Sequence, residues 1–204
     1  MGYRSITAPK RCHRPPDRGL PVLPNLLNRD FQVGGRQAVW VSDITQVRCL
    51  DGWLYLAIVL DLSTRSVVGW ATGRINNAEL VGRALEHAER KAGVPAGLMF
   101  HSDQGVQYHC EATMSWLNDR DITISMSRVG NCRDNACAES FFSLMKKEWT
   151  RPLGLLDRAE LRGEIENYIE TYYTKIRCHE SLQGKTPEAF RTEYLASRSQ
   201  PGIH

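Results

Sequence analysis

The sequence predicts an α/β fold in which helices cover both faces of a mixed five-stranded sheet. Three apolar, β-branched segments, at about 38–47, 53–62 and 67–71, follow one another with short connections. This arrangement favours an antiparallel meander. Two shorter apolar strands, at about 98–100 and 121–126, then alternate with segments of helical periodicity. Such alternation is typical of parallel additions to a sheet with helices on both of its faces.

The three leading strands are justified by their connections and by their apolar content. Asp51-Gly52 is a turn dipeptide, so the first two strands are expected to form a hairpin. The long apolar run from Trp53 to Leu62 predicts a central strand that is buried on both faces. The polar segment 63–66 is expected to be the turn that leads into the third strand.

Apolar residues at helical spacing predict the helices. The first is expected to begin after Asn77, which can cap a helix, and to end at Gly93 and Pro95. Its apolar face consists of Leu80, Val81, Ala84, Leu85 and Ala88. Further helices are expected at about 111–117, 135–149 and 158–176. The last of these carries an apolar stripe formed by Leu161, Ile165, Tyr168, Ile169, Tyr172 and Ile176.

Charge and proline content divide the chain of 204 residues. Residues 1–36 hold seven basic and two acidic residues and five of the nine prolines, which predicts a basic, proline-rich arm or linker. A solvated tail and an arm that touches a polyanion both fit this composition. We expect a core at residues 37–150 and a helical extension of that core at 151–204.

Composition also excludes several classes of protein. No run of 18 apolar residues is present, so a membrane span is not expected. The first ten residues lack the apolar stretch of a secretory signal. The six cysteines are scattered, and Cys132 and Cys137 lack zinc spacing, so small thiols in a reducing cytoplasm are expected rather than a disulfide scaffold or a zinc site.

Three acidic residues stand in unusual places. Asp43 lies inside an apolar strand, where a carboxylate is costly unless it is paired or bound to a cation. Asp103 directly follows the fourth strand, and Gly105 lets the chain turn there. Glu139 lies near the start of a helix, on a polar stripe that also holds Ser143 and Lys146.

Each acid also has an ordinary structural explanation. Asp43 can cap a bulge, Asp103 can form an Asx turn, and Glu139 can be a first-turn helix acid. Asp61 also ends an apolar strand, and the Ser63-Thr64 turn that follows explains it. The spacing favours function for the other three, because 59 residues separate the first pair and 35 separate the second.

The spacing and its surroundings resemble the retroviral-integrase-like core of the D,D(35)E transposases and integrases. Three blocks carry the resemblance: residues 39–45 (VWVSDIT), 101–108 (HSDQGVQY) and 134–148 (DNACAESFFSLMKKE). The tail Arg177-x-His179-x-x-Leu182, with Thr186-Pro187, also fits the second-frame product of bacterial insertion sequences that use a two-frame transposase. The resemblance extends from about residue 25 to 194 and implies a ribonuclease-H-like fold.

The resemblance implies metal-dependent cleavage and transfer of DNA strands during transposition. It assigns Asp43, Asp103 and Glu139 as the catalytic carboxylates that hold two Mg²⁺ or Mn²⁺ ions, for which hard oxygen ligands are suited. We expect Asp43 to bridge the two ions, and the sequence does not fix this division. The expected partners are the transposon ends and the target DNA, a second copy of the chain, and an upstream-frame helix-turn-helix protein or fusion.

Basic and amide side chains near these acids are candidates for DNA contacts. Lys146 shares a helix face with Glu139, and Lys147 follows it, although a solvated lysine pair is the plain alternative. Weaker candidates are Gln104, Gln107, Arg128 and Arg177. His101 either orients the site, touches DNA or is a hydrogen-bonded structural histidine. Arg177 and His179 either bind DNA or cap the last helix.

Other functions stay open at this point. A ribonuclease-H-like nuclease would hydrolyse without joining, and a truncated, non-catalytic core would modulate a full-length partner. In a generic α/β binding module the three acids would be structural. No helix-turn-helix region is visible ahead of the core, so the chain resembles a separately encoded or truncated catalytic half. We expect it in the bacterial cytoplasm, at the nucleoid when bound to DNA.

Overall fold

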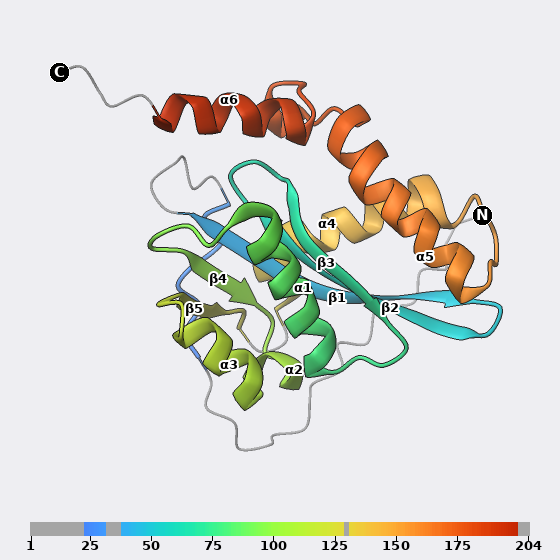
Figure 1. The fold of residues 1–204 in the computed structure, drawn as a ribbon, viewed down its shortest axis with the longest axis horizontal. Helices are drawn as coiled ribbons and strands as arrows, with labels where there is room; N and C mark the ends of the chain where they lie inside the picture. The colour runs from blue at the N-terminus through green and yellow to red at the C-terminus, as the bar shows by residue number, and fades with distance from the viewer. Residues whose placement is uncertain (1–22, 32–37, 129–130, 200–204) are drawn as a thin grey trace, which may run out of the picture.

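The strands form one mixed sheet of five in the order β3-β2-β1-β4-β5 in the computed structural model (Figure 1). The structure describes residues 23–31, 38–128 and 131–199. The strands are β1 (Val39–Cys49), β2 (Gly52–Asp61), β3 (Val67–Gly73), β4 (Met99–Ser102) and β5 (Thr123–Met126). The first three are antiparallel, and β4 and β5 add in parallel beside β1. The predicted fold is therefore confirmed.

Helices cover both faces of this sheet. They are α1 (Ala78–Ala92), α2 (Val106–His109), α3 (Glu111–Asn118), α4 (Ala136–Met145), α5 (Arg158–Asn167) and α6 (Pro187–Ser199). Figure 1 shows α1 and α3 on one face and α4 and α5 on the other. Short 3₁₀ turns occupy Cys132–Asn135 and Glu180–Leu182. No helix among these residues has the length and apolar character needed to cross a membrane.

The alternation of side chains along β1 separates two cores. Val39, Val41 and Val47 pack in the core that contains residues of α4 and α5, whereas Trp40 packs in the core that contains residues of α1. Successive side chains of a strand point to opposite faces. Asp43 therefore lies on the α4 face of the sheet, in register with the apolar residues before it.

The predicted turn and capping residues are found where the sequence places them. The side chain of Asn77 accepts a hydrogen bond of 3.1 Å from the amide of Leu80, and Gly93 ends α1 with φ 68°. Gly52 begins β2 with φ 123°, a value that favours glycine. The Oδ1 atom of Asp61 accepts from the amides of Ser63 and Thr64, so the plain turn expected there is confirmed.

Two predicted helices change their winding part of the way along. Residues Lys146–Thr150 continue α4, and Tyr168–Ile176 continue α5, as π-helical segments. Within them, the amide of Arg151 bonds to the carbonyl of Lys146, and that of Arg177 to the carbonyl of Tyr172. Apolar spacing does not distinguish one wider turn from an α-helical turn, so the sequence does not predict these segments. It also does not predict α2, which is a single turn, or the largely exposed α6.

Residues 23–31, which belong to the predicted arm, pack against the core. The Leu27 side chain is 3% exposed, and the amides of Leu26 and Leu27 donate to the Ser125 hydroxyl. The rest of the arm, residues 1–22 and 32–36, lies outside the described residues. The division of the chain at residues 36 and 150 stays a prediction.

Both outer strands of the sheet have backbone groups covered by other parts of the chain. At β3, Arg83 donates to the carbonyl of Thr72 at 2.9 Å, and Lys91 to that of Val67 at 3.4 Å. At β5, the amide of Met126 donates to the carbonyl of Pro24 at 3.0 Å. These contacts occupy groups that an edge strand otherwise exposes.

Candidate active site

The parallel pairing of β1 with β4 brings the first two predicted carboxylates together. Its register places Val41 opposite His101. Asp43 lies two residues after Val41 on β1, and Asp103 lies two residues after His101, directly after β4 ends. Neighbouring strands lie about 4.8 Å apart, and side chains at matched positions point to the same face. Asp43 and Asp103 therefore belong to one face of the sheet at one level.

Helix α4 supplies the third carboxylate. Glu139 lies in its first turn, exposed, on the face of the sheet toward which Asp43 points. The pKa of Asp43 is raised to about 7, first by burial and then by the negative charges of Asp103 and Glu139, while the amide of Ile44 and the charge of Lys146 oppose the rise. The three carboxylates are thus close enough to act on one another electrostatically.

Asp103 is held by the turn that follows β4. Its Oδ1 atom accepts a hydrogen bond of 2.9 Å from the amide of Gly105. A Cβ atom at Gly105 would lie 2.8 Å from that same oxygen, so the turn needs a residue without a side chain. Burial raises the pKa of Asp103, and the charge of His109 opposes this rise. The Asx turn thus fixes the carboxylate beside β1 and does not compete with a role in the site.

Tyr108 is a buried neighbour of the site that sequence reasoning missed. Its hydroxyl lies 3.0 Å from the Ser42 hydroxyl, and its side chain is fully buried. Burial raises the pKa of Tyr108 well above its usual value, as do the charges of Asp103 and Asp43. The only local signal is its place in the short helical turn after Gly105, because the contact with Ser42 joins residues that are far apart in the sequence.

Lys146 lies near the carboxylates, as its shared helix face with Glu139 predicts. Its ammonium group donates to the Thr45 hydroxyl at 2.6 Å, and its charge lowers the pKa of Asp43. Lys147, the next residue, is exposed. A cation beside the acids is well placed to meet a phosphate there.

The weaker candidates for DNA contact make hydrogen bonds within the protein. The Gln104 amide donates to the carbonyls of Leu23 and Ser127. Arg128 forms a two-bond fork with Asp134, and Arg177 forms one with Glu148. The side chain of Gln107 is half-buried beside the turn at Gly105. Their roles toward DNA stay predictions.

His101 is a structural histidine, one of the alternatives that the sequence left open. Its ring is fully buried, and its nitrogens lie 2.8 Å from the Ser125 hydroxyl and 3.1 Å from the Ser127 hydroxyl. Burial lowers the pKa of His101 to about 4. The neutral ring therefore ties β4 to β5 and its following loop.

The carboxylates do not form a closed ligand set. Within the part of the chain that the structure describes, no three His, Cys, Asp or Glu side chains are gathered tightly enough to hold a metal ion. Glu139 is exposed on α4, whereas Asp43 and Asp103 are partly buried. Two carboxylates are held by the sheet, and the third lies on the adjoining helix.

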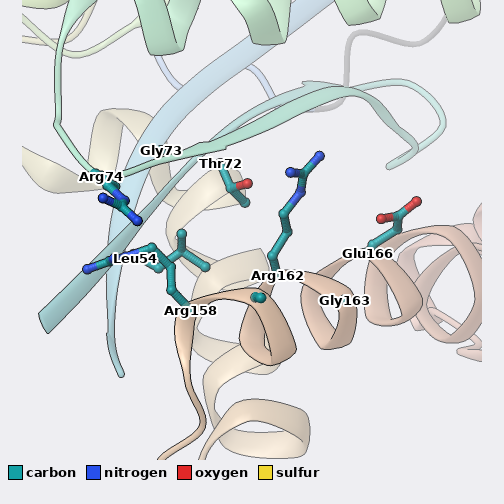
Figure 2. Close-up of a pocket in the computed structure, with 9 residues that line it drawn as sticks. Leu54, Thr72, Gly73, Arg74, Arg158, Arg162, Gly163 and Glu166 are labelled. Carbon is teal, nitrogen blue, oxygen red and sulfur yellow. The ribbon is translucent and has the colours of Figure 1, made fainter. Parts of the chain in front are cut away.

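A separate open groove of about 500 Å³ lies between α5 and the end of β3 (Figure 2). Arg74, Arg158 and Arg162 are among its lining residues, which makes its walls basic. None of the predicted site residues lines this groove. The candidate site is therefore the region around Asp43, Asp103 and Glu139, not this groove.

A mixed sheet of this order, with one acid inside β1, one just after the adjacent parallel strand β4 and one on α4, defines an integrase-type catalytic core. Comparison with known families agrees, because the family described as "Integrase core domain" matches residues 35–132 and, in a second version, residues 120–187. Residues 35–187 of the chain belong to this integrase core family, and the chain is similar to transposases of bacterial insertion sequences.

Curated relatives support this assignment. The transposase InsF of insertion sequence IS3A from Escherichia coli K12 is 39% identical over 178 residues, which are 87% of this chain and 62% of the relative. A 31 kDa protein of insertion element IS600 from Shigella sonnei is 41% identical over 179 residues, 87% of this chain and 65% of the relative. The chain thus spans less than two thirds of the length of either relative.

Solved structures share the fold. The catalytic core domain of HTLV-2 integrase in complex with magnesium matches with a TM-score of 0.60 at 16% identity, over 83% of this chain and 97% of that one. A chain of the simian T-cell lymphotropic virus intasome, in complex with the PP2A regulatory subunit B56 gamma, matches with a TM-score of 0.62 at 15% identity, over 91% of this chain and 58% of that one. The predicted integrase-like architecture is confirmed.

Proposed function

We propose that this chain is the catalytic core of a transposase that cleaves and joins DNA strands with the help of divalent cations. The observation that carries the proposal is the placing of Asp43 and Asp103 side by side on β1 and at the end of β4, with Glu139 on α4 close enough that both acids raise the pKa of the buried Asp43. Membership of the integrase core family and the likeness to insertion-sequence transposases support the assignment.

The residues present fit Mg²⁺ or Mn²⁺. All three candidate ligands are carboxylates, the hard oxygen donors that these ions prefer. The repulsion that raises the pKa of Asp43 would be relieved by a cation between the acids. Asp43 and Asp103 would hold the ions from the sheet, and Glu139 would complete the set from α4. Two ions, when bound, would activate the attacking oxygen and stabilise the departing 3′ oxygen.

The residues around the ions would position the DNA. Water, or a DNA 3′-hydroxyl, attacks phosphorus as the P–O3′ bond breaks, so hydrolysis and joining differ only in the attacking oxygen. Lys146 would hold a phosphate beside Asp43, and Lys147 would contact the backbone further out. Gln104, Gln107, Arg128 and Arg177 are secondary candidates, and three of them would first have to give up the bonds described above.

Partners and location follow from the same proposal. The substrates would be the transposon ends and the target DNA. A second copy of the chain would pair the two ends, and an upstream-frame helix-turn-helix partner or fusion would recognise them. The protein would work in the bacterial cytoplasm, on the DNA of the nucleoid.

Nicking and strand-transfer assays test the proposal. The purified chain should nick supercoiled plasmid in Mn²⁺ and join duplexes that carry the inverted repeats flanking its gene. Asp43→Asn, Asp103→Asn and Glu139→Gln should each lower both rates at least a hundredfold, while circular dichroism shows an intact fold. Nicking without joining would favour a purely hydrolytic nuclease. If the three variants nick and join DNA as fast as the wild type, the proposal is wrong.

A further inference from the structure

Asp134 and Asn135, in the 3₁₀ turn that leads into α4, are buried and bonded to separate parts of the chain. Asp134 is fully buried, and Asn135 is 4% exposed. They lie five and four residues before Glu139 in the sequence, about one helical turn away. Their contacts therefore decide where the helix that carries the third carboxylate begins.

Asn135 joins this helix to β1. Its Nδ2 atom donates to the carbonyl of Ser42 at 2.9 Å, and Ser42 directly precedes Asp43. The Ser42 hydroxyl is held on its other side by Tyr108. One side chain thus links the backbone beside the first carboxylate to the turn before Glu139.

Asp134 joins the turn before α4 to residues Asn25 and Arg29 of the arm. Its carboxylate accepts from Arg29 Nε at 2.7 Å and from Asn25 Nδ2 at 2.9 Å. Arg128 completes the set through a two-bond fork and its own amide. The bond to the Arg128 side chain, with help from Arg29, holds the pKa of Asp134 well below its usual range, so this carboxylate stays ionised.

Arg65 makes a second link between the arm and α4. Its NH1 group lies 2.7 Å from Cys137 Sγ, two residues before Glu139, and its NH2 group donates to the carbonyl of Phe31 at 3.3 Å. Two separate contacts therefore join residues 25–31 to the first turn of the helix that carries Glu139.

Stability alone does not account for Asn135. Its Oδ1 atom is buried without a hydrogen-bond partner among the described residues. Leaving a buried acceptor unpaired lowers the stability of a folded protein. An asparagine that carries this cost while bridging β1 and α4 points to a requirement for position.

We propose that Asp134 and Asn135 form a clamp that sets Glu139 relative to Asp43, and that Asn25 and Arg29 tune cation affinity through it. The clamp residues touch neither substrate nor ion and are positioning residues. The inference rests on the proposed function, since it concerns the same three carboxylates. Anything that pulls the arm away from Asp134 would weaken cation binding at a distance.

Titration with Mn²⁺ followed by electron paramagnetic resonance, without DNA, tests the clamp in the full chain. Asn135→Ala should raise the half-saturating Mn²⁺ concentration about tenfold, and Arg29→Ala about threefold. Arg29→Lys, which keeps the charge beside Asp134, should restore most of the affinity. Leu26→Ala is the matched control, because its side chain is 49% exposed in the same segment, and it should bind like the wild type.

The outcomes separate the clamp from the function on which it rests. A wild-type chain that binds no Mn²⁺ overturns both. A wild-type chain that binds, together with Asn135→Ala and Arg29→Ala variants of unchanged affinity, overturns the clamp alone. Thermal melts of the metal-free variants accompany the titration. If Asn135→Ala does not fold, the comparison of Arg29→Ala with Arg29→Lys decides, since Arg29 is a partly exposed residue at the surface.

Discussion

At the scale of single residues, the charge of Asp43 governs how the metal-free protein responds to pH. An aspartate in the unfolded chain ionises near pH 4, whereas in the folded state the pKa of Asp43 is about 7. Between about pH 4 and pH 7, the Asp43 carboxyl is protonated in the folded state and ionised in the unfolded state. The contribution of Asp43 to the free energy of unfolding therefore falls as the pH rises from about 4 to 7.

Asp43→Asn should remove this fall in the free energy of unfolding with pH. In buffer with a chelator at pH 8, the variant should exceed the wild type in free energy of unfolding by on the order of 4 kcal/mol, because about three units separate the two pKa values, and at pH 4 the two proteins should agree. Urea unfolding at both values measures the difference. Asp119→Asn, at an exposed position, is the control and should leave the pH dependence unchanged. A variant no more stable than the wild type at pH 8 would argue against crowded carboxylates.

The adjacent lysines give a matched pair for DNA contact. Lys146 is bonded to Thr45 near Asp43, whereas Lys147 is exposed on the next position of the helix. Lys146→Ala should lower the Mn²⁺-dependent nicking rate about tenfold, equivalent to ~1.4 kcal/mol of transition-state stabilisation. Lys147→Ala should lower it less than threefold. Equal effects of the two variants on plasmid nicking would show that both lysines act only through general charge.

At the scale of elements, close packing between β3 and α1 fixes one face of the sheet. A Cβ atom at Gly69 of β3 would lie 2.3 Å from the Ala84 carbonyl and 2.6 Å from Ala88 Cβ. At Gly82, inside α1, an added Cβ would meet nothing within 4 Å. Two glycines on neighbouring elements thus differ in whether a side chain can be tolerated.

These two glycines should respond in opposite directions to the same substitution. Gly69→Ala should lower the free energy of unfolding by about 1–3 kcal/mol, because α1 must move away from the sheet. Gly82→Ala should raise it by about 0.5–1 kcal/mol, because alanine loses less conformational freedom in a helix. Chemical unfolding measures both. A Gly69→Ala variant as stable as the wild type would mean that α1 is not packed so tightly.

The predicted elements show which features local patterns contain. Strands and helices followed from apolar spacing. Asp43, Asp103 and Glu139 were singled out by their places along the chain and by a spacing that resembles the D,D(35)E pattern, and their role stays a prediction. Tyr108 and Asn135 were missed, because each matters through a contact with Ser42 that no local pattern records. The π-helical segments were missed because they differ from an α-helix only in which carbonyl each amide meets.

At the scale of the whole molecule, the arm belongs partly to the core. Proline and basic content predict a linker for residues 1–36, yet Leu27 in this stretch is buried while its neighbour Leu26 is 49% exposed. Composition describes how a segment behaves alone and does not reveal where one leucine will pack. The described part of the arm is therefore a component of the fold.

Leu27→Ala should destabilise the whole molecule. Removing its buried side chain should cost about 2–3 kcal/mol, which for a chain of this size lowers the melting temperature by roughly 5–10 °C. Leu26→Ala should shift it by less than about 2 °C. Thermal denaturation followed by circular dichroism makes the comparison. Equal melting temperatures for the two variants would place the arm outside the cooperative unit.

The covered strand edges limit how copies of this molecule can associate. Arginine and lysine side chains occupy two carbonyls of β3, and the carbonyl of Pro24 occupies an amide of β5, so these groups are not open to a foreign strand. Templated growth from one molecule to the next, the route to fibrils, is thereby disfavoured. If copies of the chain gather on DNA as proposed, they would contact one another through helices and loops, where contacts can form and release without disturbing the sheet.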